Sequence, residues 1–285
     1  MAEREGVVLR RTPYELVFGP ERFEAEVFPA IAAEAESRQP GRLVPETFIM
    51  LGTVGNLLRD LRPGETGQSP PAEAIRQYGS LTWQAWSFWR AGRPAGAVPE
   101  SVVRAVHASP GPGAWSFRPP AIAGYLQLPR HRFWTRVDEA GPAEPLDGFH
   151  WTWLEADPVA GRASPRIDLL LALGVRPGRG GLSVIEVSAT PPPGPAAHWA
   201  GIDARESGTD FENILPGGGL QGYLGIGSVA EVLKLVSRCF YWIETHGFEE
   251  VPAPQDATVP ESVDDMPDSE LPFRRVAAAA EDGGS

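Results

Sequence analysis

Two acidic residues draw attention because each interrupts an almost uniformly apolar segment. Asp168 lies within residues 167–175, and Glu186 lies within residues 182–188. Segments of this composition are typical of strands buried at the centre of a sheet. Burial disfavours the charged form of a carboxyl group and raises its pKa, so such an acid can serve as a general acid or base.

Two histidines in neighbouring segments could complete such a site. His150 and His131 would each supply an imidazole, the side chain that most readily exchanges protons near neutral pH. Asp168, Glu186, His150 and His131 are therefore our candidate catalytic residues, for a metal-independent reaction such as a hydrolysis. The competing interpretation is structural, with the acids near strand ends or paired with arginines such as Arg166.

A second pattern mixes basic and aromatic residues over positions 130–136. Proteins that bind single-stranded nucleic acid place charges against phosphates and rings against bases. The sheet region 118–188 nevertheless holds eight arginines and eight acidic residues, so we do not expect nucleic acid as the partner. The candidate binding residues are Arg130, Arg132, Trp134, Arg136, Trp151 and Trp153.

Motifs with a known catalytic mechanism are absent from the sequence. There is no Gly-x-Ser-x-Gly, no His-Glu-x-x-His, no phosphate loop ending in Gly-Lys-Ser/Thr, and no Cys-x-x-Cys. Residues 189–227 contain several acids and His198, but their spacing matches no metal-ligand motif. The sequence therefore predicts neither a metal nor a cofactor, and it leans away from an enzyme.

The net charge of −12 is concentrated towards the C-terminal end. Residues 249–285 carry ten acidic residues and two arginines, a net of −8, which leaves −4 for residues 1–248. A body so close to neutral lacks the positive charge typical of duplex-DNA binders. Cys239 is the single cysteine, and no run approaches about 18 apolar residues. We therefore expect a soluble, cytoplasmic protein that does not associate with membranes.

Helical periodicity is found on both sides of the region that resembles a sheet. Pro29 should kink the helix predicted over residues 21–37. The tryptophans of the helix predicted over residues 71–90 are expected to be core residues rather than a platform for a ligand. The last helix begins at a Ser-x-x-Glu capping box and ends at Gly247. Apolar spacing predicts helices over residues 21–37, 45–62, 71–90, 99–107 and 228–246.

Alternating and apolar segments predict a sheet between these helices. In residues 149–154, Phe149, Trp151 and Trp153 should share one face. The Gly-rich turn 176–181 predicts an antiparallel hairpin, and residues 6–18 could add an N-terminal hairpin. Strands are predicted over residues 121–128, 132–137, 149–154, 167–175 and 182–188.

Together these elements predict an α+β fold with a mostly antiparallel sheet over residues 118–188. We expect one body over residues 5–248, followed by a disordered acidic tail, 249–285, that either docks on a partner or only solvates the protein. Within the body we expect a helical part, 20–108, a sheet part, 114–190, a long loop, 189–227, and a helix, 228–246.

The absence of catalytic motifs favours a non-enzymatic binding or assembly protein, whose partner is another protein or a second copy of the chain. A metal-independent enzyme with a carboxylate and histidine site on the sheet is the first alternative. Binding of single-stranded nucleic acid is the second.

Overall fold

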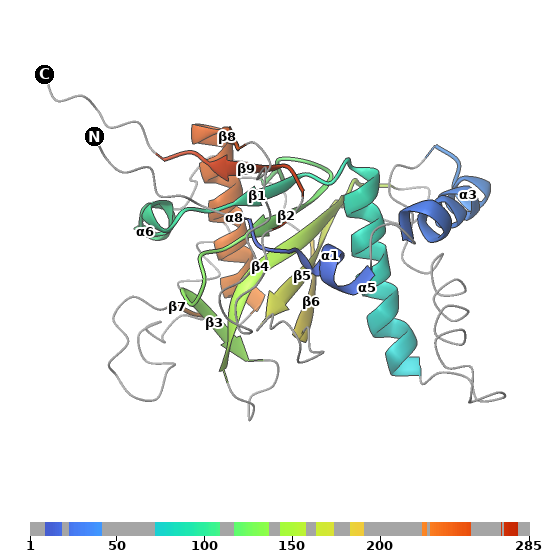
Figure 1. The fold of residues 1–285 in the computed structure, drawn as a ribbon, viewed down its shortest axis with the longest axis horizontal. Helices are drawn as coiled ribbons and strands as arrows, with labels where there is room; N and C mark the ends of the chain where they lie inside the picture. Colours follow the sequence, from blue (N-terminus) through green and yellow to red (C-terminus); the bar gives the residue numbers. More distant parts are fainter. Residues whose placement is uncertain are drawn as a thin grey trace, which may run out of the picture.

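The computed structural model places a mixed sheet between helices (Figure 1). The predicted helix over residues 45–62, the turn 176–181 and most of the long loop lie outside the described residues. The structure describes residues 9–18, 23–41, 72–108, 117–136, 143–157, 164–173, 183–190, 224–226, 229–251, 269 and 271–278.

The helices largely follow the apolar periodicity of the sequence. Three predicted helices are confirmed as α5, α6 and α8, and Pro29 lies where a π-helical turn passes into α3, as its expected kink requires. Gly247 ends α8 with a φ of 81°, and its N–H donates to the carbonyl of Ile243. The helices are α1 (Pro13–Phe18), η1 (Phe23–Val27), α3 (Phe28–Arg38), α5 (Ala72–Arg90), α6 (Glu100–Ala108) and α8 (Val229–His246).

Nine strands within the described residues form the sheet, in the order β6-β5-β4-β2-β1-β9-β8, with β3 pairing with β4 and β7. β4 is antiparallel to β2, β3 and β5, and the β5–β6 and β8–β9 pairs are also antiparallel. The fold is therefore α+β with a mostly antiparallel sheet, as predicted. The strands are β1 (Ala95–Ala97), β2 (Ala123–Gln127), β3 (Phe133–Arg136), β4 (Ala143–Leu154), β5 (Arg166–Leu173), β6 (Ser183–Ala189), β7 (Leu224–Ile226), β8 (Phe248–Val251) and β9 (Phe273–Val276).

Each face of the sheet packs against its own set of helices. On one face, Phe149 and Trp151 of β4 join a core cluster with Phe240 of α8 and with residues of α6. On the other face, Leu154 joins a cluster that includes Trp86 of α5 and residues of α1 and α3. The predicted alternation along β4 is therefore correct. Trp83 and Trp86 of α5 lie in the core, where burial of a large apolar side chain stabilises the fold by about 1.5–3 kcal/mol, and Trp89 is partly buried against the same cluster.

The prediction of an N-terminal hairpin is wrong over residues 13–18, which form α1. Thr12 and Glu15 make a capping box, because the Thr12 N–H donates to Glu15 Oε2 at 2.7 Å and the Glu15 N–H donates to Thr12 Oγ1 at 3.3 Å. Pro13 occupies the first turn, where its missing N–H costs nothing. Local capping therefore outweighs the alternating pattern of apolar residues.

The prediction of disorder from residue 249 onwards is wrong for β8 and β9. β9 lies inside the sheet between β1 and β8, and Phe273 is only 4% exposed. The prediction failed because composition averaged over an acidic segment hides short apolar groups. β1 lies outside all the predicted strands, and it pairs in parallel with both β2 and β9.

Candidate functional site

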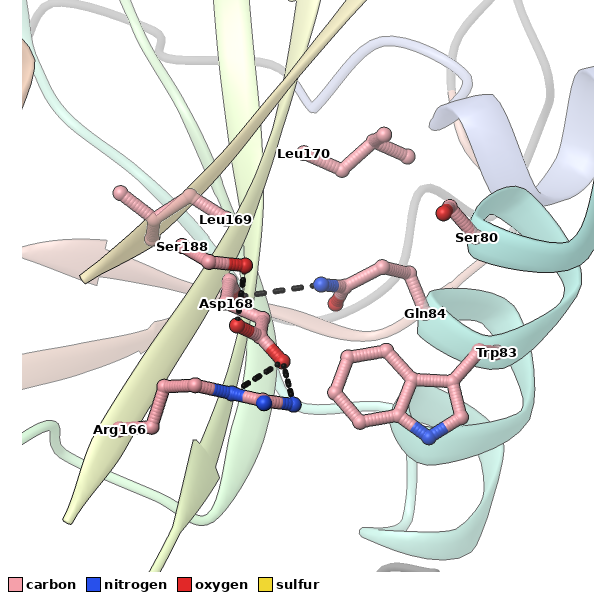
Figure 2. Close-up of a pocket in the computed structure, with 8 residues that line it drawn as sticks. All are labelled: Ser80, Trp83, Gln84, Arg166, Asp168, Leu169, Leu170 and Ser188. Atoms are coloured by element: carbon pink, nitrogen blue, oxygen red, sulfur yellow. Dashed lines mark hydrogen bonds and ion pairs between the residues drawn. The ribbon is translucent and has the colours of Figure 1, made fainter. Parts of the chain in front are cut away.

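A row of polar side chains crosses three strands on the sheet face that is covered by α5. Thr152 of β4 pairs with Asp168 of β5, and Asp168 pairs with Ser188 of β6. Residues paired in a ladder project from the same face of a sheet, so the register alone aligns these three side chains. The row ends at a pocket of about 210 Å³ (Figure 2), lined by Ser80, Trp83, Gln84, Arg166, Asp168, Leu169, Leu170 and Ser188.

Asp168 is the centre of this pocket and is only 6% exposed. Its Oδ2 accepts hydrogen bonds from Nε and Nη2 of Arg166, at 3.1 and 2.8 Å, and its Oδ1 accepts one from Ser188 Oγ at 2.6 Å. Arg166 stands two residues before Asp168 on the same strand, so both side chains leave the same face. Asp168 therefore pairs with an arginine, as the structural interpretation of this residue predicts.

Gln84 connects α5 to the buried end of the row. Its Oε1 accepts a hydrogen bond from Thr152 Oγ1 at 2.8 Å, and its Nε2 donates to the backbone carbonyl of Asp168 at 3.1 Å. Gln84 and Thr152 are both buried, whereas Ser188 is exposed and the Arg166 side chain is 32% exposed. The network therefore runs from the core to the surface, with every polar group held in a defined orientation.

His150 lies on the same face but does not belong to this network. It pairs with Leu170, two residues along the strand from Thr152, and its ring lies between those of Phe88 and Tyr125, at 5.2 and 4.7 Å. The residue is 2% exposed, and within the described structure its Nδ1 has no hydrogen-bond partner. Burial lowers the pKa of His150 to about 3, so the ring is neutral at physiological pH.

Of the other two candidate catalytic residues, His131 lies away from the pocket, and Glu186 is placed by the pairing of its backbone. His131 is exposed in the turn between β2 and β3, with a φ of 59° and its ring stacked on Trp134 at 5.8 Å. Glu186 pairs with Leu170 in the β5–β6 ladder. The pocket therefore includes Asp168 of the four predicted residues, and the two histidines are not part of it.

The candidate binding tryptophans do not form a surface platform. Trp151 is 3% exposed, packs edge-on against Phe240 at 5.1 Å, and donates from Nε1 to the carbonyl of Ala121. Trp153 is partly buried against Phe117. We therefore correct the prediction for Trp151, which is a core residue because the inward face of β4 packs on α8.

The candidate binding arginines also have different surroundings within the protein. Arg132 forms an ion pair with Glu100 of α6, and Arg130 is half-buried. Arg136 pairs with Ala143 through the backbone of β3 and β4. The Trp134 indole is half-buried and donates to the carbonyl of His131 at 3.2 Å. Trp134 and Arg132 therefore have partners within the protein, and with Trp151 in the core the predicted set does not share one face.

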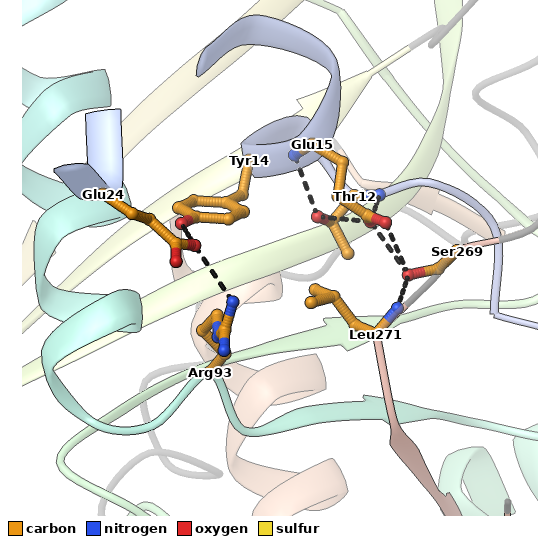
Figure 3. A network of polar contacts seen from close by, with 7 residues as sticks. All are labelled: Thr12, Tyr14, Glu15, Glu24, Arg93, Ser269 and Leu271. Atoms are coloured by element: carbon orange, nitrogen blue, oxygen red, sulfur yellow. Dashed lines mark hydrogen bonds and ion pairs between the residues drawn. The ribbon is translucent and has the colours of Figure 1, made fainter. Parts of the chain in front are cut away.

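A second polar network joins segments far apart in the sequence (Figure 3). Ser269 Oγ donates to the carboxylate of Glu15 at 2.9 Å, and the Ser269 N–H donates to the carbonyl of Leu9 at 2.7 Å. Tyr14 donates its hydroxyl proton to Glu24, which also pairs with Arg93 at 3.0 Å. Burial, together with Glu24, raises the pKa of Tyr14. These groups bond to one another, so we interpret this network as structural.

Gln84, Thr152, Ser188 and Ser80 were missed as site residues by sequence reasoning. The available signal was the occurrence of a polar residue in each of three strands, but the strand register is needed to align them. Among the described residues, no group of three or more His, Cys, Asp or Glu could hold a metal ion. None of the described helices is both long and apolar enough to cross a membrane.

Comparisons with known proteins identify no family for this chain. No family model matches it, and no curated protein is similar. A solved structure described as the crystal structure of AcrVA2 is similar over 92% of this chain and 81% of that chain, with a TM-score of 0.43 and 9% sequence identity. A similarity of this size carries no argument about function.

Proposed function

We propose that this chain is a non-enzymatic binding protein, and that its pocket beside Asp168 holds a small polar group of a partner molecule. One observation carries the proposal: the pocket is lined by polar groups that the protein itself already orients. Asp168 accepts three side-chain hydrogen bonds, and Gln84 is fixed at both ends of its amide. Preorganised groups of this kind lower the entropic cost of binding.

The arrangement supports binding over catalysis. A general base must reach the proton that it abstracts, directly or through one water. The Asp168 carboxylate is occupied by Arg166 and Ser188, and His150 is buried between two aromatic rings outside the pocket. The carboxylate and histidine site that an enzyme would use is therefore not supported by the geometry of these residues.

The size of the pocket indicates what kind of partner it receives. Sites that enclose a whole small molecule usually have volumes of roughly 300–1,000 Å³. The volume of about 210 Å³ suits one functional group of a larger partner, such as a side chain of another protein. A cytoplasmic setting is part of the same proposal, since the sequence has a single cysteine.

A crosslinking experiment tests this function. A photoreactive residue would replace Thr190, which is exposed directly after β6, and in a control it would replace Glu244, which is exposed on α8. We expect a specific adduct from position 190 in extracts of the source organism and none from position 244. Light scattering then shows whether the partner is a second copy of the chain.

The purified partner allows a quantitative test of the pocket. Arg166→Gln should weaken its binding by about tenfold or more, because a charged hydrogen-bond donor at an interface is worth about 1.5–3 kcal/mol. Arg38→Gln is the matched control, since Arg38 is an exposed arginine on α3. Equal adducts from both positions, or an affinity that Arg166→Gln leaves unchanged, would contradict the proposal.

A further inference from the structure

The segment around β9 is fastened to both helix layers of the protein, and we infer that it is a releasable strap that controls the geometry of the pocket. The strap consists of Ser269 and residues 271–277. Its release loosens α1, then α5, and then the Gln84 amide that fixes the strand of Asp168. The coupling within the chain stands without a ligand, whereas its effect on a partner rests on the proposed binding function.

One anchor of the strap is Ser269, which holds α1 (Figure 3). Its hydroxyl oxygen lies 2.9 Å from both carboxylate oxygens of Glu15, and its N–H donates to the carbonyl of Leu9 at 2.7 Å. The same hydroxyl oxygen accepts the N–H of Leu271 at 3.0 Å. Ser269 is 1% exposed, so any of these groups left without its partner would lose a hydrogen bond that water cannot readily replace.

The other anchor lies at the end of α8, on the opposite face of the sheet. Ala277 accepts a hydrogen bond from Trp242 Nε1 at 2.9 Å, and its N–H donates to the carbonyl of Gly247 at 3.2 Å. Trp242 belongs to the core cluster of α8, whereas Leu271 belongs to the cluster that includes α1. The strap therefore crosses from one helix layer to the other and is held at both ends.

Between the anchors, β9 is held by short ladders. It pairs in parallel with β1 at Gly96 and Ala97, and it pairs antiparallel with β8, the last strand in the described order. Parallel pairing is slightly weaker per residue than antiparallel pairing. Proteins open locally in cooperative units, and short elements away from the centre of a sheet open at a lower free energy than its central strands. The strap therefore opens as one unit while β4 and β5 stay folded.

The helix α1 connects the strap to α5. Tyr14, which adjoins Glu15, is 1% exposed and packs edge-on against Phe88 of α5, with ring centroids 5.4 Å apart. Phe88 lies four residues after Gln84, so both side chains leave the same face of α5. Gln84 in turn donates to the carbonyl of Asp168. Each link is a direct contact, so the loosening of α1 reaches the pocket.

The chain before α1 limits this motion. The N–H of Arg10 donates to Gln127 Oε1 at 2.8 Å, and Arg10 Nη2 donates to the carbonyl of Leu128 at 3.2 Å. These bonds attach Arg10 to β2 and to the residue after it, and the strap takes no part in them. Release of the strap therefore loosens α1 about its first residues and leaves the sheet folded.

Hydrogen exchange followed by NMR on the full chain tests the strap. Ser269→Ala removes one anchor, and Trp242→Phe removes the donor at the other anchor while keeping a ring. The reporter in α1 is the amide of Leu16, which donates to the carbonyl of Thr12 at 3.1 Å. We expect both variants to speed its exchange by about fivefold or more, because each removes a buried hydrogen bond that the closed strap makes.

A control separates opening of the strap from unfolding of the whole protein. Ile167 is fully buried in β5, which β4, β2 and β1 separate from β9. Ile167→Val lowers the overall stability without touching the strap. It should speed exchange in β5 and leave the amide of Leu16 at the wild-type rate.

The side-chain amide protons of Gln84 report the pocket end of the coupling. We expect Ser269→Ala and Trp242→Phe to speed their exchange by about twofold or more. Unchanged exchange at Gln84 would overturn the control of the pocket.

The strap itself is overturned if Trp242→Phe leaves the exchange of Leu16 unchanged, because α1 would then open without it. It is also overturned if Ile167→Val speeds that exchange as much as the strap variants do, because α1 would then open only with the whole protein. None of these measurements needs a partner, so the crosslinking experiment decides separately on the binding function.

Discussion

The Nε2 of Gln84 donates to the backbone carbonyl of Asp168 at 3.1 Å, so one side chain of α5 fixes the strand that carries the pocket. The other end of the same amide accepts from Thr152 Oγ1, on the neighbouring strand. A buried amide bonded at both ends has a single orientation. The position of the Asp168 carboxylate therefore depends on the helix above the sheet as well as on the sheet itself.

Replacing Gln84 should destabilise the protein. Gln84→Leu leaves the hydroxyl of Thr152 buried without a partner, and we expect a loss of about 2 kcal/mol in the free energy of unfolding. Urea denaturation measures this loss. The double variant Gln84→Leu with Thr152→Val removes both polar partners, so it should lose less than the sum of the two single changes. Strict additivity would show that the two side chains are not coupled.

The stability of the protein should decrease as the pH is lowered, because His150 is buried in its neutral form. Its pKa is about 3 in the folded state and near 6.5 in an unfolded chain, so between these values only the unfolded chain binds the proton. The neutral ring contributes its full stability above pH 6.5, and we expect on the order of 4 kcal/mol to be lost as the pH falls towards 3. Thermal unfolding at a series of pH values measures the slope.

The variant that tests this prediction is His150→Phe. His150→Phe removes the titrating group while keeping a ring between Phe88 and Tyr125, so its stability should depend much less on pH than that of the wild type. Identical slopes for His150→Phe and the wild type would refute the assignment.

The thiol of Cys239 should be unreactive in the folded protein. Burial raises the pKa of Cys239 to about 12, and the thiolate is the form that attacks disulfide reagents. We expect dithionitrobenzoate at pH 8 to label the native chain only as fast as it unfolds, and to label the chain in denaturant at once. Rapid labelling of one thiol per native chain would contradict the burial of this residue.

Phe273 and Arg274 form a matched pair that tests whether β9 belongs to the sheet. Phe273→Ala should lower the free energy of unfolding by about 3–5 kcal/mol, as for other buried phenylalanines. Arg274 is exposed, and Arg274→Ala should cost less than about 1 kcal/mol. A disordered segment would tolerate both changes equally, so equal small losses in urea denaturation would remove β9 from the fold.

The sequence predicts best the elements whose pattern is local and long. The apolar spacing of α5 and α8 and the apolar runs of β5 and β6 need no information from distant residues. The pairing of Asp168 with Arg166 was also foreseeable, because two residues on one strand share a face.

The elements that were not predicted depend on distant partners or on local hydrogen bonds that the spacing of apolar residues does not reveal. β1 is an Ala-Gly-Ala segment that becomes a strand only because β2 and β9 lie on either side of it. In α1, the apolar residues alternate as in a strand, and the hydrogen bonds between Thr12 and Glu15 decide the outcome. The pocket required both the register of three strands and the reach of Gln84, and neither can be read from spacing along the chain.

The position of β9 affects how the protein is made. In the finished sheet, Gly96 pairs with Arg274, so two segments that are 178 residues apart in the sequence are neighbours. During synthesis on the ribosome, the edge of β1 that pairs with β9 stays unpaired until residue 276 has been synthesised. Bringing such distant segments together is slow, because the entropy of closing a long loop must be lost before the strand pairing repays it. A nascent chain of this protein therefore exposes an unpaired edge of β1 from the time β1 forms until β9, the last of the described strands, has been synthesised and closes that edge.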